Sequence, residues 1–156
     1  MIRTVNAFLI LVLVGVLLAG LYQQYFRDNP ICALCYLQRI GMIGVATGLL
    51  MNLRFGVRSR HYALSLLSAF FGGGVALRHI CLHICPQFPV FGTPVLGLSL
   101  YTWSFLVFVC SSLSIIVLLF FEPPPQQAMN RFEKMVCGLL LATTALNIVS
   151  AGSWHG

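Results

Sequence analysis

NAFLILVLVGVLLAGLY occupies residues 6–22 and contains no charged side chain. A helix needs roughly 20 apolar residues to cross the hydrocarbon core of a bilayer, and this stretch comes close to that length. Three comparable runs lie at 36–53, 62–84 and 98–121, and a shorter, more polar run lies at 135–151. We therefore expect an all-α integral membrane protein, a four-helix transmembrane bundle with a short fifth C-terminal segment that we interpret as a span.

The composition excludes an ordinary soluble domain. Of the 156 residues, 59% are apolar and only 8% are charged, whereas soluble domains carry about 25% charged residues. The net charge of +6 does not indicate nucleic-acid binding, because the basic residues are scattered and no aromatic–basic stripe accompanies them. We treat residues 1–156 as one membrane domain, in which Gly72, Gly73 and Gly74 indicate a close approach between helices.

The basic residues predict the orientation of the chain in the membrane. Most of them lie near the N-terminus, between the second and third runs, or before the fifth run: Arg3, Arg54, Arg58, Arg60, Arg131 and Lys134. By the positive-inside rule these regions are cytoplasmic. The connections around residues 23–35 and 85–97 then face outward, which decides the chemistry available to the cysteines they carry.

Two cysteines, Cys32 and Cys35, stand at the outer end of the second run. A C-x-x-C spacing lets two thiols bridge at a helix start, and an oxidising outer compartment supports such a disulfide. Cys35 is expected in the first helical turn, where unpaired N–H groups and the helix dipole favour the thiolate that disulfide exchange requires. Arg39 follows one turn deeper on the same face, and an arginine just inside lipid commonly marks a functional site.

Other interpretations of these residues stay open. A lone C-x-x-C is also found as a structural disulfide or as half of a metal site, and Arg39 could simply extend its charge to the membrane interface. A c-type haem site is excluded, because Tyr36 stands where C-x-x-C-H requires histidine.

The run CALCYLQR at residues 32–39 resembles the C-x-x-C-x-x-x-R motif of the DsbB family of disulfide bond formation proteins. The resemblance extends to LRH at 77–79, to LGL at 96–98 and to Trp103, and covers roughly residues 5–121. It implies a bacterial inner-membrane enzyme that passes electrons to ubiquinone or menaquinone. Its partner would be a periplasmic thiol oxidase of the thioredoxin-fold DsbA type, which it reoxidises.

The same resemblance implies roles for individual residues. Cys32 and Cys35 would be the membrane-proximal redox pair on the periplasmic side, with Cys35 as the thiolate that faces the quinone. Arg39 and His79 would help to hold the quinone head group. The N-terminus of this multi-pass protein would be cytoplasmic.

The second outer loop departs from the family, whose members often carry a second, widely spaced cysteine pair there. This loop is short and offers only Cys81 and Cys85, four residues apart near a helix end that Pro86 is expected to terminate. They could form the partner-facing disulfide if the last turn loosens, although ideal helical geometry does not favour it, or they could pack as small apolar residues. His79 and His83 share a helix face and could bind a metal, but without nearby carboxylates we assign no metal ligand.

Three other functions remain as alternatives. The chain could be a metal-handling membrane protein, a structural subunit braced by a C-x-x-C disulfide, or a relative of vitamin K epoxide reductase, in which the pair lies late in the chain. Cys110 and Cys137 are interpreted as inert fillers, and Tyr101 and Trp103 as interfacial aromatics.

Overall fold

The computed structural model describes residues 2–26, 32–84, 97–121 and 128–152, and in those residues the regular structure consists of five α-helices. They are α1 (Ile2–Phe26), α2 (Ala33–Phe55), α3 (Ser59–Ile84), α4 (Leu100–Leu119) and α5 (Arg131–Gly152). Each is long and apolar enough to cross a membrane. The expected all-α membrane bundle is confirmed, and the fifth segment is a helix of 22 residues.

Most of the helices extend beyond the apolar runs in the sequence. α2 begins at Ala33 and α5 at Arg131, three and four residues before the corresponding runs. A membrane helix continues beyond the hydrocarbon core into the interface, where polar side chains are accommodated and the apolar run in the sequence is interrupted. α4 is shorter than its run. It begins only at Leu100, after Gly97 has turned the chain with φ +78°, a conformation that favours glycine.

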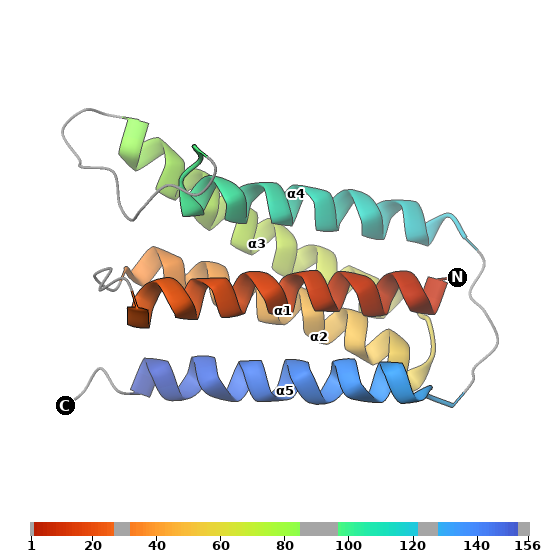
Figure 1. Ribbon diagram of the computed structural model, residues 1–156. Helices are drawn as coiled ribbons and strands as arrows, with labels where there is room; N and C mark the ends of the chain where they lie inside the picture. Colours follow the sequence, from red (N-terminus) through yellow and green to blue (C-terminus); the bar gives the residue numbers. More distant parts are fainter. Residues whose placement is uncertain (1, 27–31, 85–96, 122–127, 153–156) are drawn as a thin grey trace.

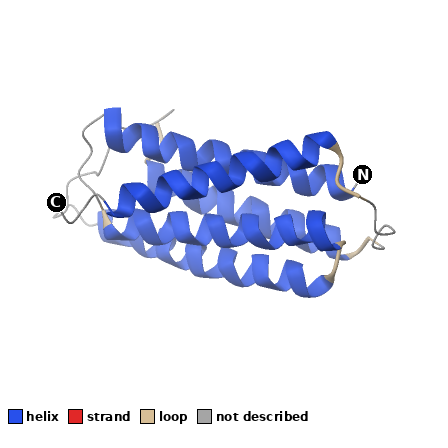
Figure 2. Ribbon diagram, turned by 90° about the horizontal axis from the view of Figure 1, so that it is seen from below, coloured by secondary structure: helices blue, strands red, loops and turns tan. Residues whose placement is uncertain are grey.

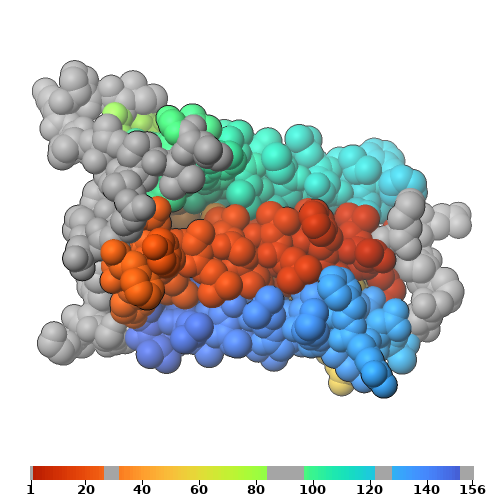
Figure 3. Space-filling view, viewed as in Figure 1, coloured from red at the N-terminus to blue at the C-terminus, as the bar shows by residue number. Residues whose placement is uncertain are grey.

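Successive helices run in opposite directions, so the two chain ends lie at opposite ends of the bundle (Figure 1). α1 contacts α2, α4 and α5, and α3 lies between α2 and α4 (Figure 1, Figure 2). On the face shown in Figure 3, α4, α1 and α5 lie next to one another along the long axis of the molecule.

α1 shows how the sequence distributes its apolar side chains. Ala7, Ile10, Val14 and Leu17 recur at intervals of three or four residues and are buried against the other helices. Phe8 on the opposite side is 63% exposed. An outward-facing apolar surface of this kind suits lipid rather than water.

The closest approach between helices is that of α2 and α3. A Cβ atom on Gly41 would lie 2.8 Å from the Cα of Gly72, and a Cβ on Gly48 would collide with Ser65. Small residues of this kind let helix backbones pack directly in lipid. The expected role of the glycine triplet is confirmed at Gly72, whose missing Cβ also leaves room for the ring of Phe108 on α4.

The end of the bundle that carries the N-terminus is tied by one ion pair. Arg3 on α1 donates to both carboxylate oxygens of Glu133 on α5, at 2.9 and 2.6 Å, and its Nη2 also donates to the Leu53 carbonyl of α2 at 3.2 Å. Glu133 additionally accepts the backbone N–H of Asn130, three residues earlier, which caps α5. Both partners of the ion pair are nearly buried, so three helices are joined at this end.

We expect Gly72→Ala to lower the free energy of unfolding by about 1–3 kcal/mol, because the added methyl group would overlap the fully packed ring of Phe108. The measurement is unfolding of the purified protein in mixed micelles. Gly74→Ala is the matched control, since a Cβ at Gly74 meets nothing within 4 Å. Equal losses of stability in the two variants would contradict the packing described for α2, α3 and α4.

Candidate redox site

The two cysteines of the C-x-x-C sequence lie on either side of the start of α2. Cys32 is the N-cap residue, with extended backbone (φ −109°, ψ 124°), and its carbonyl accepts the N–H of Tyr36 at 3.2 Å. Cys35 is the third residue of the helix and therefore lies in its first turn. The helix thus begins three residues earlier than the apolar run predicted, and its first turn brings the second thiol back towards the first.

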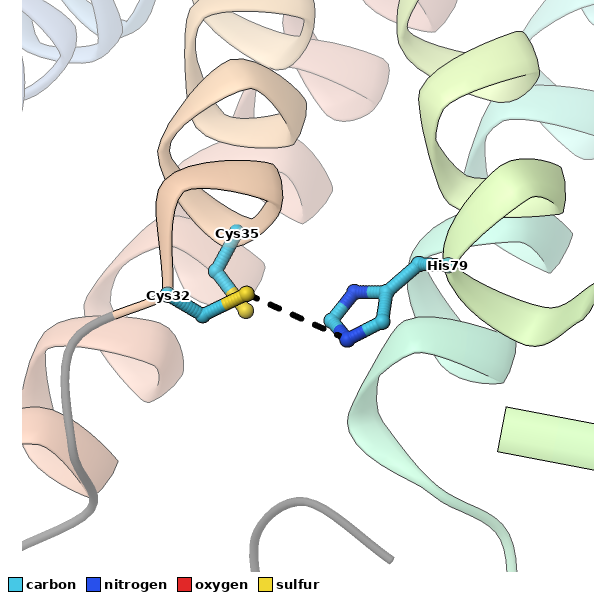
Figure 4. A group of neighbouring side chains, drawn as sticks. All are labelled: Cys32, Cys35 and His79. Atoms are coloured by element: carbon cyan, nitrogen blue, oxygen red, sulfur yellow. Dashed lines mark hydrogen bonds between the residues drawn. The ribbon is translucent and has the colours of Figure 1, made fainter. Parts of the chain in front are cut away.

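His79 on α3 is the third member of this cluster. Its side chain is only 1% exposed, and its Nε2 lies 4.0 Å from the Sγ of Cys32 (Figure 4). The two sulfur atoms and a ring nitrogen of His79 all lie within 4.8 Å of one another. The structure therefore brings together three of the six residues that the sequence analysis selected.

Gln38 holds the imidazole from the side opposite Cys32. Its amide Nε2 lies 3.2 Å from Nδ1 of His79, and the Gln38 residue is 3% exposed. With this amide orientation the Gln38 N–H donates to Nδ1 of His79. The hydrogen of a neutral imidazole is then on Nε2, which faces Cys32. Gln38 was not among the site residues predicted from the sequence, where the signal for it is a polar residue three positions after Cys35, on the same helix face.

Arg39 is directed towards α1. Its Nη1 donates to Oε1 of Gln24 at 2.7 Å, and its Nη2 donates to the carbonyl of Gly20 at 2.8 Å. Its guanidinium also lies over the ring of Tyr36, 5.4 Å from the centroid, at a distance typical of a cation–π contact. Hydrogen bonds to α1 therefore fix Arg39, whereas Gln38 on α2 fixes His79.

Tyr101 on α4 completes an aromatic cluster beside the site. Its ring centroid lies 4.6 Å from that of His79 and 5.1 Å from that of His83. His83 is itself anchored, because its Nδ1 lies 2.9 Å from the carbonyl of His79 and donates to it. Tyr101 is 9% exposed and packs against two imidazoles; its position at the membrane interface stays a prediction.

The second cysteine pair is only half described. Cys81 lies near the end of α3 with an exposed side chain and is not part of the cluster of Cys32, Cys35 and His79. Cys85 lies outside the described residues, so the Cys81–Cys85 disulfide stays a prediction.

A family model described as "Disulfide bond formation protein DsbB" matches residues 2–91, which is more than half of the chain and contains α1, α2 and α3. The LGL sequence at 96–98 and Trp103, which the sequence analysis also compared with that family, lie beyond the matched residues. Searches of curated proteins and of solved structures found no match.

Mild oxidation is expected to close a disulfide between Cys32 and Cys35, because their sulfur atoms already lie within 4.8 Å of each other. Peptide mass spectrometry after alkylation would then find these two cysteines unalkylated and joined within one chain. Cys110 and Cys137, on α4 and α5, serve as internal controls and should remain alkylated. Continued alkylation of Cys32 and Cys35, or disulfides joining them to other residues, would contradict the geometry of the pair.

Proposed function

Since the chain belongs to the DsbB family of disulfide bond formation proteins, we propose that it is an inner-membrane thiol:quinone oxidoreductase that reoxidises a periplasmic DsbA-like protein of thioredoxin fold. One observation carries the proposal: a C-x-x-C pair at the start of a membrane helix lies against a buried imidazole of the next helix. Such a pair can alternate between dithiol and disulfide while a neighbouring group handles the proton.

The arrangement of the helices supports an orientation for the site. The N-terminus of α1, the C-terminus of α2 and the N-termini of α3 and α5 share one end of the bundle (Figure 1). Most of the basic residues gather at that end: Arg3, Arg54, Arg58, Arg60, Arg131 and Lys134. The positive-inside rule assigns it to the cytoplasm, so Cys32 and Cys35, at the opposite end, face the periplasm.

His79 is suited to move the proton of Cys32. When the Gln38 amide donates to Nδ1, the hydrogen on Nε2 points at Cys32 and can donate to its thiolate. When the amide is turned by 180°, its oxygen accepts the Nδ1 hydrogen and Nε2 can accept the thiol proton. In this second orientation the amide oxygen accepts the Nδ1 hydrogen both before the transfer and after it, when the ring is an imidazolium whose Nε2 hydrogen faces the Cys32 thiolate.

The residues around the pair also fit a quinone head group. A bound quinone would supply an acceptor for two electrons and two protons. Arg39 carries five N–H donors in a fixed plane, of which those on Nη1 and Nη2 already donate to Gln24 and Gly20. His79 offers a ring N–H, and the ring of Tyr101 packs beside His79. A positive charge at the edge of the bilayer favours negative charge that develops on an oxygen held there, which is the role proposed for Arg39.

Electrons enter the chain by thiol–disulfide exchange. A thiolate of the reduced partner attacks one sulfur of a disulfide in this chain, forms a mixed disulfide and releases the other sulfur as a thiolate; the partner's second thiolate then breaks the mixed bond. The partner leaves with a disulfide and the chain keeps two thiols. Cys81 and Cys85 are proposed as the entry pair. Once they are reduced, one of their thiolates attacks the Cys32–Cys35 disulfide and the other resolves the mixed disulfide, so the Cys81–Cys85 disulfide forms again and Cys32 and Cys35 become the dithiol that a quinone would reoxidise.

Loss of either redox cysteine should abolish turnover, whereas loss of Arg39 should weaken it. In quinone-dependent oxidation of a reduced DsbA-like protein, we expect no measurable activity for Cys32→Ala or Cys35→Ala and full activity for Cys110→Ala. Arg39→Ala should lower kcat/KM for the quinone by about 10–100-fold, because a lost hydrogen bond to a charged group costs about 1.5–3 kcal/mol. The matched control is Arg78→Ala, an exposed arginine on α3, and an unchanged quinone dependence in Arg39→Ala would refute its assigned role.

The proposed orientation predicts which thiols a membrane-impermeant maleimide reaches in intact cells. In a background without other cysteines, Cys32 should react from outside after treatment with a reductant. A cysteine introduced by Ser59→Cys lies in the exposed first turn of α3, at the end of the bundle that carries most of the basic residues. It should react only after the cells are opened. Reaction of Cys32 solely in opened cells would reverse the orientation and remove the periplasmic partner from the proposal.

A further inference from the structure

Cys32, Cys35 and His79 present two thiols and one imidazole nitrogen to a common point between α2 and α3 (Figure 4). We propose that these three side chains, when the cysteines are reduced, form a binding site for a thiophilic divalent cation such as Zn²⁺, and that cation binding and disulfide formation exclude each other. The site needs neither the quinone nor the partner protein, so it goes beyond the function proposed above.

The spacing of the three donors is close to that of a zinc site. Zinc binds sulfur at about 2.3 Å and imidazole nitrogen at about 2.0–2.1 Å, which places tetrahedral ligands about 3.6–3.8 Å apart. Cys32 Sγ and His79 Nε2 are 4.0 Å apart, and no pair in the cluster exceeds 4.8 Å. Inward side-chain shifts of about 1 Å or less would therefore close the site around the ion.

The balance of charge favours the bound form at the edge of the membrane. Binding of a divalent cation releases one proton from each thiol, and two thiolates with one such cation and a neutral imidazole carry no net charge. A neutral complex avoids the cost of placing a net charge near lipid. Arg39, four residues after Cys35 on α2, donates to Gly20 and Gln24 on α1 rather than to this cluster.

Gln38 supplies the supporting contact that metal-bound histidines usually have. A histidine that binds metal through Nε2 carries its hydrogen on Nδ1 and donates it to a neighbouring acceptor. The Gln38 amide lies 3.2 Å from Nδ1 of His79 and is buried, and a 180° turn of the amide presents its oxygen to that hydrogen. The ring is thus already held at the angle that points Nε2 at the sulfur of Cys32.

The cluster lies at the end of a helix, where Cys32 precedes the first residue of α2 and is only partly buried. Three protein ligands leave a fourth position for water. Because a disulfide has no thiolate to offer, the ion can bind only to the reduced pair and would hold it reduced.

Cadmium binding to the full-length protein in detergent tests the proposal. Cys81, Cys85, Cys110 and Cys137 are changed to serine so that only the pair can respond. The reduced protein, freed of reductant, is titrated with Cd²⁺ alone while the ultraviolet thiolate-to-cadmium band is recorded, and Zn²⁺ is then added as competitor. We expect one ion per chain, displacement by Zn²⁺, and no band after the pair has been oxidised or after Cys32→Ser or Cys35→Ser.

Variants of the histidines separate a three-ligand site from simple binding to a dithiol. His79→Ala should raise the Kd for Cd²⁺ at least about 10-fold, and Gln38→Leu about 10-fold, as for the loss of a ligand and of its supporting contact. His83→Ala, one turn further along α3, is the matched control and should leave the Kd unchanged. His79→Cys, which keeps a donor at this position, should restore tight binding and so shows that the effect of alanine is not misfolding.

Equal affinity of the parent protein and His79→Ala would overturn the proposal, as would weak binding in both His79→Cys and His79→Ala or an undiminished band in the oxidised protein. These outcomes are independent of the oxidase assay. Absence of cadmium binding would leave quinone-dependent thiol oxidation intact, and absence of that activity would leave the cation site standing.

Discussion

The close packing of α2 against α3 is the constraint on which the candidate redox site depends. Lipid offers no hydrophobic drive for helices to associate, so direct packing must hold them together, and glycines permit the nearest approach. Gly72 and His79 are seven residues apart, two turns along one face of α3, and Gln38 precedes Gly41 by about one turn on α2. The contacts between α2 and α3 therefore run from Gly41 and Gly72 to Gln38 and His79. This alignment of the two helices places the imidazole opposite Cys32.

α5 connects the two ends of the bundle although it lies outside the residues that match the family. At the basic end it is held by the ion pair of Arg3 and Glu133. At the other end the hydroxyl groups of Tyr36 and Ser150 lie 2.9 Å apart in a hydrogen bond. The guanidinium of Arg39 lies over the ring of Tyr36, so α5 contacts the arginine indirectly, through the side chain of Tyr36. The fifth helix is thus part of the framework of the site rather than an appendage.

The sequence was sufficient to predict the features that depend on one helix at a time. The apolar runs predicted the membrane bundle, and the C-x-x-C at the start of a run predicted thiols at a helix terminus. The contacts of Gln38, Tyr101 and Ser150 could not be foreseen, because a polar or aromatic residue in an apolar helix can face any neighbour until the rotation of both helices is known. The hydrogen bond of Arg39 to a backbone carbonyl of α1 has the same origin: it depends on which face α1 turns towards α2, and no periodicity in α2 encodes that.

The choice of an amide to hold His79 has a physical consequence of its own. A carboxylate in the place of Gln38 would be an ionised group in a residue of 3% exposure, which is costly unless it is paired with a positive charge, and it would favour the cationic form of the imidazole. A cationic ring can donate to a thiolate but cannot accept a thiol proton, and it has no lone pair for a metal ion. The neutral amide places no additional charge at the edge of the membrane. With its oxygen turned towards Nδ1 it accepts the Nδ1 hydrogen of the neutral ring, whose Nε2 can take the thiol proton, and also that of the resulting imidazolium, which can return the proton to the Cys32 thiolate.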